Sequence, residues 1–94
     1  MPAGLTKECV LAAGAYNDFV PDLVNHAIDE ITALDPQATF TVGREYSMVL
    51  YIESRLSLTQ VKRILTQASP DEIDLVESMP MPRGRSRRIR VWWD

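Results

Sequence analysis

The chain has 94 residues, of which 46% are hydrophobic and 24% are charged, and its formal net charge is −3. This length supports one domain with a modest core, and the composition excludes a disordered chain. The single cysteine excludes an intrachain disulfide and is typical of the reducing cytoplasm. No apolar run reaches the roughly 20 residues of a membrane span, and the short run at 9–16 lacks the basic leader of a signal peptide.

The charge is unevenly distributed along the chain. Residues 80–94 contain five arginines and one aspartate, a net charge of +4, so the remaining residues carry −7. An asymmetry of this size points to an interaction surface near the C-terminus.

Two helices are predicted near the N-terminus, after a frayed segment at residues 1–4. The first has an apolar stripe at helical spacing: Leu5, Cys9, Ala12 and Tyr16. The second has the stripe Tyr16, Val20, Leu23, Ala27, Ile31 and Leu34. Asn17 and Asp18 interrupt the pattern, Asp18 is a suitable N-cap, and Pro21 fits the first turn of the second helix. We therefore expect helix over about 6–34, in two pieces that end before Pro36.

Residues 39–53 are predicted to form a β-hairpin that turns at 43–45. Its second strand, residues 46–53, has one wholly apolar face: Tyr46, Met48, Leu50 and Ile52. The other face is half apolar, which favours an interior strand with a helix packed on one side.

A third helix is predicted after this hairpin. Ser57 and Gln60 have the spacing of a capping box, and the helix stops before Pro70. The apolar face of this amphipathic segment consists of Leu58, Val61, Ile64, Leu65 and Ala68.

Residues 71–78 fit two structures. Pro70 followed by two acids resembles a helix start, whereas the alternation around Ile73 and Leu75 is typical of a strand. We favour the strand, because two helices without a linker would need a sharp turn. Residues 79–86 contain two prolines and a glycine and predict a flexible loop. The last segment is predicted to be a strand, with Ile89, Val91 and Trp93 on one face and Arg88, Arg90 and Trp92 on the other.

The expected fold is a single α+β domain of element order α-β-β-α-β-β. Its helices would cover one face of a four-stranded, mostly antiparallel sheet, as a two-layer sandwich.

The sequence contains no specific signal for catalysis. His26 and Cys9 are 17 residues apart, and only a tight fold-back near residue 17 would bring them together. His26 shares a predicted helix side with Asp22, Asp29 and Glu30, but carboxylates near one histidine are ordinarily solvated pairs and not a metal site. We expect no enzymatic activity, no cofactor and no bound metal.

The arginine run permits two interpretations. Arg88 and Arg90 would face the acidic residues Glu72 and Asp74 if the last two strands pair, which would neutralise them internally. Alternatively, the arginines bind phosphates and Trp92 stacks on a base. Arg83 and Arg85 have no evident structural partner in the sequence.

We therefore predict a non-enzymatic protein-interaction module in the cytoplasm, with no membrane partner. It would be a small adaptor, regulator or inhibitor of a larger complex, of the kind common in phages. Its predicted contact residues are Met81, Arg83, Arg85, Arg90 and Trp92. Nucleic-acid binding through the same arginines is the alternative.

Overall fold

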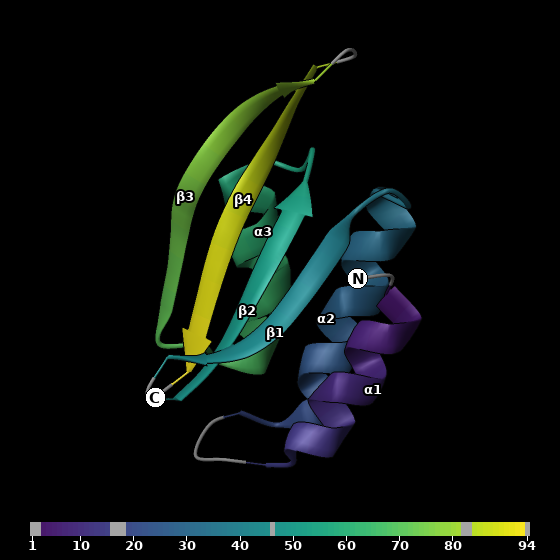
Figure 1. Cartoon of the computed structure of the whole chain (residues 1–94), viewed down its shortest axis with the longest axis vertical. Coiled ribbons are helices and arrows are strands. Elements are labelled where there is room, and N and C mark those ends of the chain that lie inside the picture. The colour runs from purple at the N-terminus through teal and green to yellow at the C-terminus, as the bar shows by residue number, and fades with distance from the viewer. Residues whose placement is uncertain (1–2, 16–18, 46, 82–83, 94) are drawn as a thin grey trace.

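The computed structural model describes residues 3–15, 19–45, 47–81 and 84–93, and within them the chain forms helices and one antiparallel sheet (Figure 1). The elements are, in chain order, α1 (Ala3–Ala13), α2 (Pro21–Leu34), β1 (Thr39–Glu45), β2 (Ser47–Ser54), α3 (Leu58–Leu65), the 3₁₀ turn η1 (Thr66–Ala68), β3 (Glu72–Met81) and β4 (Gly84–Trp93). The predicted α+β class is confirmed. The two-piece helix, the hairpin and the strand at residues 71–78 are confirmed as well.

The sheet has the strand order β1-β2-β4-β3, and every neighbouring pair is antiparallel. β4 lies between β2 and β3, although β3 follows β2 in the chain with only α3 and η1 between them. β2 is an interior strand, as its two-sided apolar pattern predicts. β1 and β3 are the two edges of the described sheet.

The core lies between α2, α3 and one face of the sheet. Leu50 of β2 is opposite Val42 on one side and Val91 on the other, so one face carries a row of apolar side chains. Trp93 is completely buried, and its Nε1 donates a hydrogen bond of 2.8 Å to the carbonyl of Ala68. The predicted inward face of the last strand is thereby confirmed.

The first helix buries a different face from the predicted one. Thr6 and Val10 are fully buried, whereas Leu5, Cys9 and Ala12 of the predicted stripe are exposed. In a short helix rich in alanine, two faces are similarly apolar, and periodicity does not choose between them. The choice is made by α2, which folds back along α1. Helix α1 already begins at Ala3, so fraying does not extend to residues 3 and 4.

The buried face of α2 also differs in part from the predicted stripe. Ala27 and Ile31 are buried as expected, but Val24 and Ile28 complete the face. Three other described members of the predicted stripe, Val20, Leu23 and Leu34, are 40%, 41% and 61% exposed. Pro21 begins the helix as predicted, but the N-cap position belongs to Val20. The predicted cap Asp18, like Asn17, Tyr16 and Tyr46, lies outside the described residues.

The capping box of α3 is confirmed. The Gln60 backbone N–H donates to Ser57 Oγ at 3.2 Å, and the Ser57 N–H donates to Gln60 Oε1 at 3.0 Å. This reciprocal pair fixes the start of α3, and the left-handed Ser69 (φ 52°) ends the turn that follows it.

The predicted loop at residues 79–86 is wrong in its described part. Met79–Met81 belongs to β3 and Gly84–Ser86 to β4, with Pro80 opposite Arg85. β2 ends opposite Arg87, so the end of the β3–β4 hairpin is a two-stranded ribbon that extends beyond the sheet (Figure 1). Each strand of such a ribbon has an outer edge, where a proline without an N–H is tolerated.

A candidate interaction surface on the open sheet face

The sheet face opposite the core carries a cluster of aromatic and charged side chains. No described helix crosses this face over β2, β4 and β3, and α3 lies behind the sheet in Figure 1. We call this surface the open face and define it by six residues: Tyr51, Glu53, Glu72, Arg88, Arg90 and Trp92. Strand register makes them neighbours, because Tyr51 is opposite Arg90 and Glu53 is opposite Arg88.

Arg88 is held between two side chains of β2. Its Nη1 donates to Glu53 Oε1 at 3.2 Å, and its guanidinium carbon lies 4.7 Å from the centroid of the Tyr51 ring. A guanidinium at this distance is attracted to the ring face. Arg88 therefore combines an ion pair with an aromatic contact, and its side chain is 37% exposed.

Arg90 is surrounded in a similar way by β3 and β4. Its Nη1 lies 3.8 Å from Glu72 Oε2 and 3.6 Å from Asp74 Oδ2, and its guanidinium carbon lies 5.8 Å from the Trp92 ring centroid. The predicted pairing of Arg90 with the acidic strand and its contact with Trp92 are confirmed.

Arg87 and Arg88 of this strand have partners outside the predicted acidic strand. Arg88 pairs with Glu53 of β2, because β4 is interior and has a neighbour on both sides. Arg87 Nη1 donates to the carbonyl of Arg55 at 3.0 Å. Neither partner was predicted, because the sequence pattern pointed to β3 alone as the neighbour of this strand.

The open face is closely packed and its arginines are paired with carboxylates. Val49, which is opposite Trp92, is only 2% exposed although it lies on this side of β2. Tyr51 and Trp92 are half-buried, so each presents part of its ring. The two arginines of the face are matched by carboxylates from both adjacent strands.

The structure brings together only part of the predicted contact set. Arg90 and Trp92 are neighbours on the open face. The backbone of Met81 is opposite Gly84 in the ribbon, but its side chain and that of Arg85 lie outside what the structure describes. Arg83 lies outside the described residues altogether.

The predicted contact set does not include Tyr51, Glu53 or Arg88, which the structure places on this surface. Tyr51 and Glu53 fall on the half-apolar face of the 46–53 strand, so the alternation placed them together. The missing information was that β4 lies directly beside β2.

Cys9 and His26 face different parts of the molecule. Cys9 is exposed and lines a shallow groove of about 340 Å³ between α1 and β1. His26 Nδ1 lies 2.6 Å from Gln67 Oε1 and 3.5 Å from Glu30 Oε1, on the side of α2 that faces η1. α2 folds back along α1, but the contacts of His26 are with Gln67 and Glu30 and not with Cys9.

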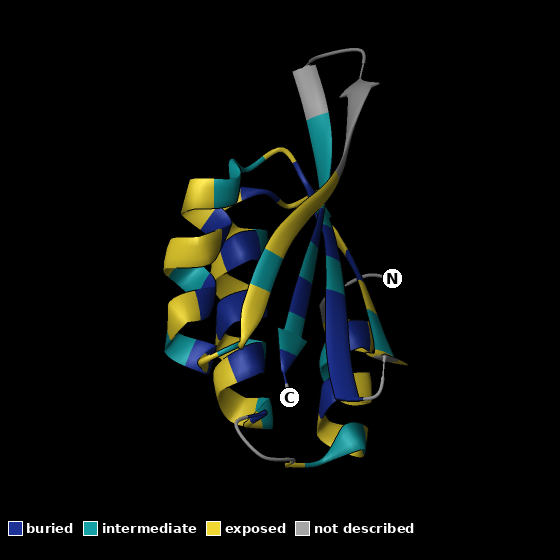
Figure 2. Cartoon of the chain, turned by 90° about the vertical axis from the view of Figure 1, so that its left-hand side faces the viewer, coloured by how far each residue is buried: buried dark blue, intermediate teal, exposed yellow. Residues whose placement is uncertain are grey.

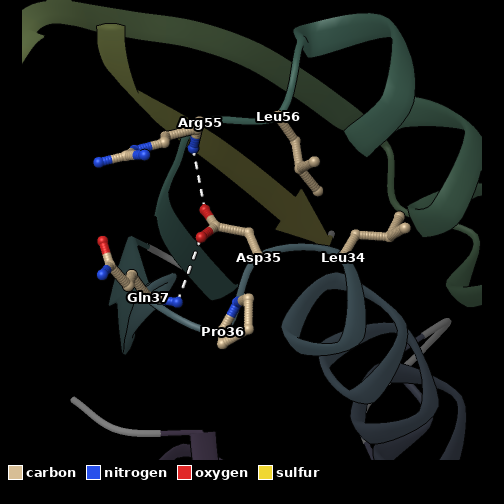
Figure 3. Close-up of a pocket in the computed structure, with 6 residues that line it drawn as sticks. All are labelled: Leu34, Asp35, Pro36, Gln37, Arg55 and Leu56. Carbon is tan, nitrogen blue, oxygen red and sulfur yellow. Dashed lines mark hydrogen bonds between the residues drawn. The ribbon is translucent and has the colours of Figure 1, made fainter. Parts of the chain in front are cut away.

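Asp35 is a buried carboxylate at the end of α2, beside a hollow of about 390 Å³ (Figure 3). Its Oδ2 accepts hydrogen bonds from Ser54 Oγ at 2.7 Å and from the Arg55 N–H at 3.0 Å, and its Oδ1 accepts one from the Gln37 N–H at 3.2 Å. Burial by itself raises the pKa of Asp35, but these hydrogen bonds and the Arg55 charge outweigh burial and hold the pKa below its ordinary value.

This arrangement makes Asp35 a structural tie. The ionised carboxylate joins the end of α2 to the end of β2, and it is the acceptor in all three hydrogen bonds. A carboxyl group with a lowered pKa is a poor general acid near neutral pH.

Among the described residues, no group of three or more metal-ligating side chains could hold a metal ion, and none of the described helices is long and apolar enough to span a bilayer.

The chain was also compared with protein-family models, curated proteins and solved structures. No protein-family model, curated protein or solved structure matches the chain.

Proposed function

We propose that the chain is a non-enzymatic protein-binding module whose contact surface is the open face of the sheet. The observation that carries the proposal is the cluster of Tyr51, Trp92, Arg88 and Arg90 on a face that no described helix covers. Tyrosine, tryptophan and arginine are the residues most enriched at the energetic centres of protein interfaces.

The ion pairs favour a protein partner over a nucleic acid. Phosphate binding needs arginines whose charge is available, but Arg88 is paired with Glu53, and Arg90 is shared by Glu72 and Asp74. A negatively charged backbone would approach carboxylates as well as guanidinium groups. Pairing also holds both arginines in place over the aromatic rings, which reduces the entropy lost on binding a protein surface.

The end of the hairpin is proposed to extend this surface. Met81, Arg83 and Arg85 are the predicted contacts there, and they belong to the same C-terminal hairpin segment as Arg90 and Trp92. The module would act as an adaptor, regulator or inhibitor of a larger complex. A cytoplasmic location is inferred from the single, unpaired cysteine.

The test is capture of partners from the native host, followed by mass spectrometry and titration of the proteins found. Trp92→Ala is expected to weaken capture about thirtyfold, as for a residue worth about 2 kcal/mol in the interface. Arg88→Met, which keeps the aliphatic stem and removes the charge, should weaken it less. Leu34→Ala is the matched control, because Leu34 is 61% exposed on a helix away from the open face.

Two results would redirect the proposal. Unchanged capture by folded Trp92→Ala would move the contact surface elsewhere, first to the acidic side of α2 around Asp22, His26 and Asp29. Binding of a single-stranded oligonucleotide that weakens steeply with salt would favour the nucleic-acid alternative, because phosphate contacts release counterions and Trp-centred protein contacts do not.

A further inference from the structure

The outer edge of β3 is a long strand edge without a described neighbour. β3 pairs with β4 from Glu72 to Met81, and the Asp71 N–H extends this pairing to the Trp92 carbonyl at 2.9 Å. No other described strand pairs with β3. Figure 2 faces this edge, and no described element lies over it. Alternate N–H and C=O groups of such an edge point outward and can pair with an added strand.

The other edge of the sheet is different. β1 packs against α1, and it is the shorter of the two edge strands. Of the two edges, β3 therefore offers the longer strand for pairing.

The β3 edge also presents apolar surface. Leu75 and Val76 are 44% and 51% exposed, although they are adjacent residues in a strand of the sheet. The register shift between Leu75 and Glu77 makes Val76 an extra residue opposite β4, that is, a β-bulge. Regular pairing on the outer side is therefore available over Glu72–Leu75, and Val76 offers an apolar contact at its end.

The charge of this edge indicates which strand it can accept. The side chains of Glu72 and Asp74 are 48% and 60% exposed, and both lie near the same arginine, Arg90, at 3.8 and 3.6 Å. One guanidinium shared by two carboxylates leaves an excess negative charge on the edge. A second copy of β3 would bring the same carboxylates to the shared edge, and like charges that face each other across strands are unfavourable.

We infer that the outer edge of β3 binds an extended, basic segment of a partner protein as an additional strand. Backbone hydrogen bonds to residues 72–75 would supply the binding, lysines or arginines facing Glu72 and Asp74 would supply the selection, and an apolar side chain would cover Val76. The chain already contains one such pairing, because the arginine-rich β4 occupies the inner edge of the same strand. This inference concerns the backbone edge of β3 and not the open face, and Glu72 is the residue that the two proposed surfaces share.

The probe is an acetylated, amidated peptide of seven residues in which lysine alternates with threonine or valine. We expect saturable binding at low salt, slower amide exchange at Ile73 or Leu75, and no binding of the analogue with glutamate in place of lysine. A peptide N-methylated at alternate residues, which lacks half of its donors, should bind at least about tenfold more weakly.

Matched variants locate the site. Asp74→Lys should weaken binding at least about tenfold, and Asp74→Asn should have a smaller effect. Thr41→Lys, an exposed position on β1, is the control for added charge and should bind as the wild type does.

Several outcomes would overturn the inference. They are the absence of binding, equal binding of the N-methylated peptide, or equal binding by folded Asp74→Lys. Self-association in sedimentation experiments that Asp74→Lys changes would assign the edge to a second copy and would also overturn it.

Discussion

Replacement of Asp35 is the most informative test of the fold, because one carboxylate joins α2 to the end of β2. Asp35→Ala removes the acceptor for Ser54 Oγ and for the backbone N–H groups of Arg55 and Gln37. Asp35 is 8% exposed and Ser54 is 3% exposed, so water does not easily replace the lost partner. Ser54 Oγ also accepts from the Leu56 N–H at 3.1 Å, so disturbance of Ser54 would reach the segment that leads into α3.

The expected magnitude follows from these contacts. Hydrogen bonds to a charged group contribute roughly 1.5–3 kcal/mol each, and a buried donor without an acceptor is unfavourable by a similar amount. The N–H groups of Arg55 and Gln37 belong to exposed residues and can bind water instead. Counting the buried Ser54 bond in full and the two part-buried backbone bonds only in part, we expect Asp35→Ala to lower the free energy of unfolding by about 2–4 kcal/mol. Asp35→Asn keeps one acceptor oxygen and should cost about half as much.

The pH dependence gives a second, independent signature. The pKa of Asp35 is lowered in the folded protein from its ordinary value of 3.8, although burial by itself would raise it. A carboxyl group with a lowered folded pKa stabilises fully above its unfolded pKa, and this stabilisation is lost as the pH falls through the folded value. The difference in stability between wild type and Asp35→Asn should therefore be constant near neutral pH and shrink below 3.8.

The assay is urea denaturation followed by circular dichroism, at about pH 7 and at about pH 2.5. Glu8→Gln is the control, because Glu8 is an exposed carboxylate on α1 and surface changes usually stay within about 0.5 kcal/mol. An Asp35→Asn penalty that is the same at both pH values would refute the assignment of an ionised, hydrogen-bonded Asp35. A loss below about 0.5 kcal/mol for Asp35→Ala would show that the tie does not contribute to stability.

Two further predictions concern helices. Ser57→Ala removes the hydroxyl half of the capping box and should lower the free energy of unfolding by about 1 kcal/mol. Thr59→Ala, at an exposed position in the same turn, is the control and should change it little. Equal effects of the two variants in chemical denaturation would contradict the cap. Val10→Ala should destabilise the protein by about 1–3 kcal/mol, whereas Cys9→Ala should be nearly neutral. Native Cys9 should react with a thiol reagent, because it is exposed. A Cys9 protected from the reagent would show that α1 buries the predicted face.

Local signals in the sequence determined most of the elements. The capping box of Ser57 and Gln60 is complete within four residues, so the start of α3 needs no distant partner. The alternation in β2 and β4 reports burial on one side of a strand, and it correctly assigned Leu50, Val91 and Trp93 to the core. These features depend on period and on near neighbours, which the sequence contains directly.

The tertiary structure decided which of two similar local choices prevails. Either apolar stripe of α1 is acceptable in isolation, and contact with α2 selects Thr6 and Val10 for burial. Residues 79–81 form part of a strand because β4 offers pairing partners, despite a proline at position 80. Arg88 meets Glu53 because β4 is inserted between β2 and β3. Each of these outcomes depends on which segments become neighbours across the sheet, and strand order is a property of the whole chain that no local pattern encodes.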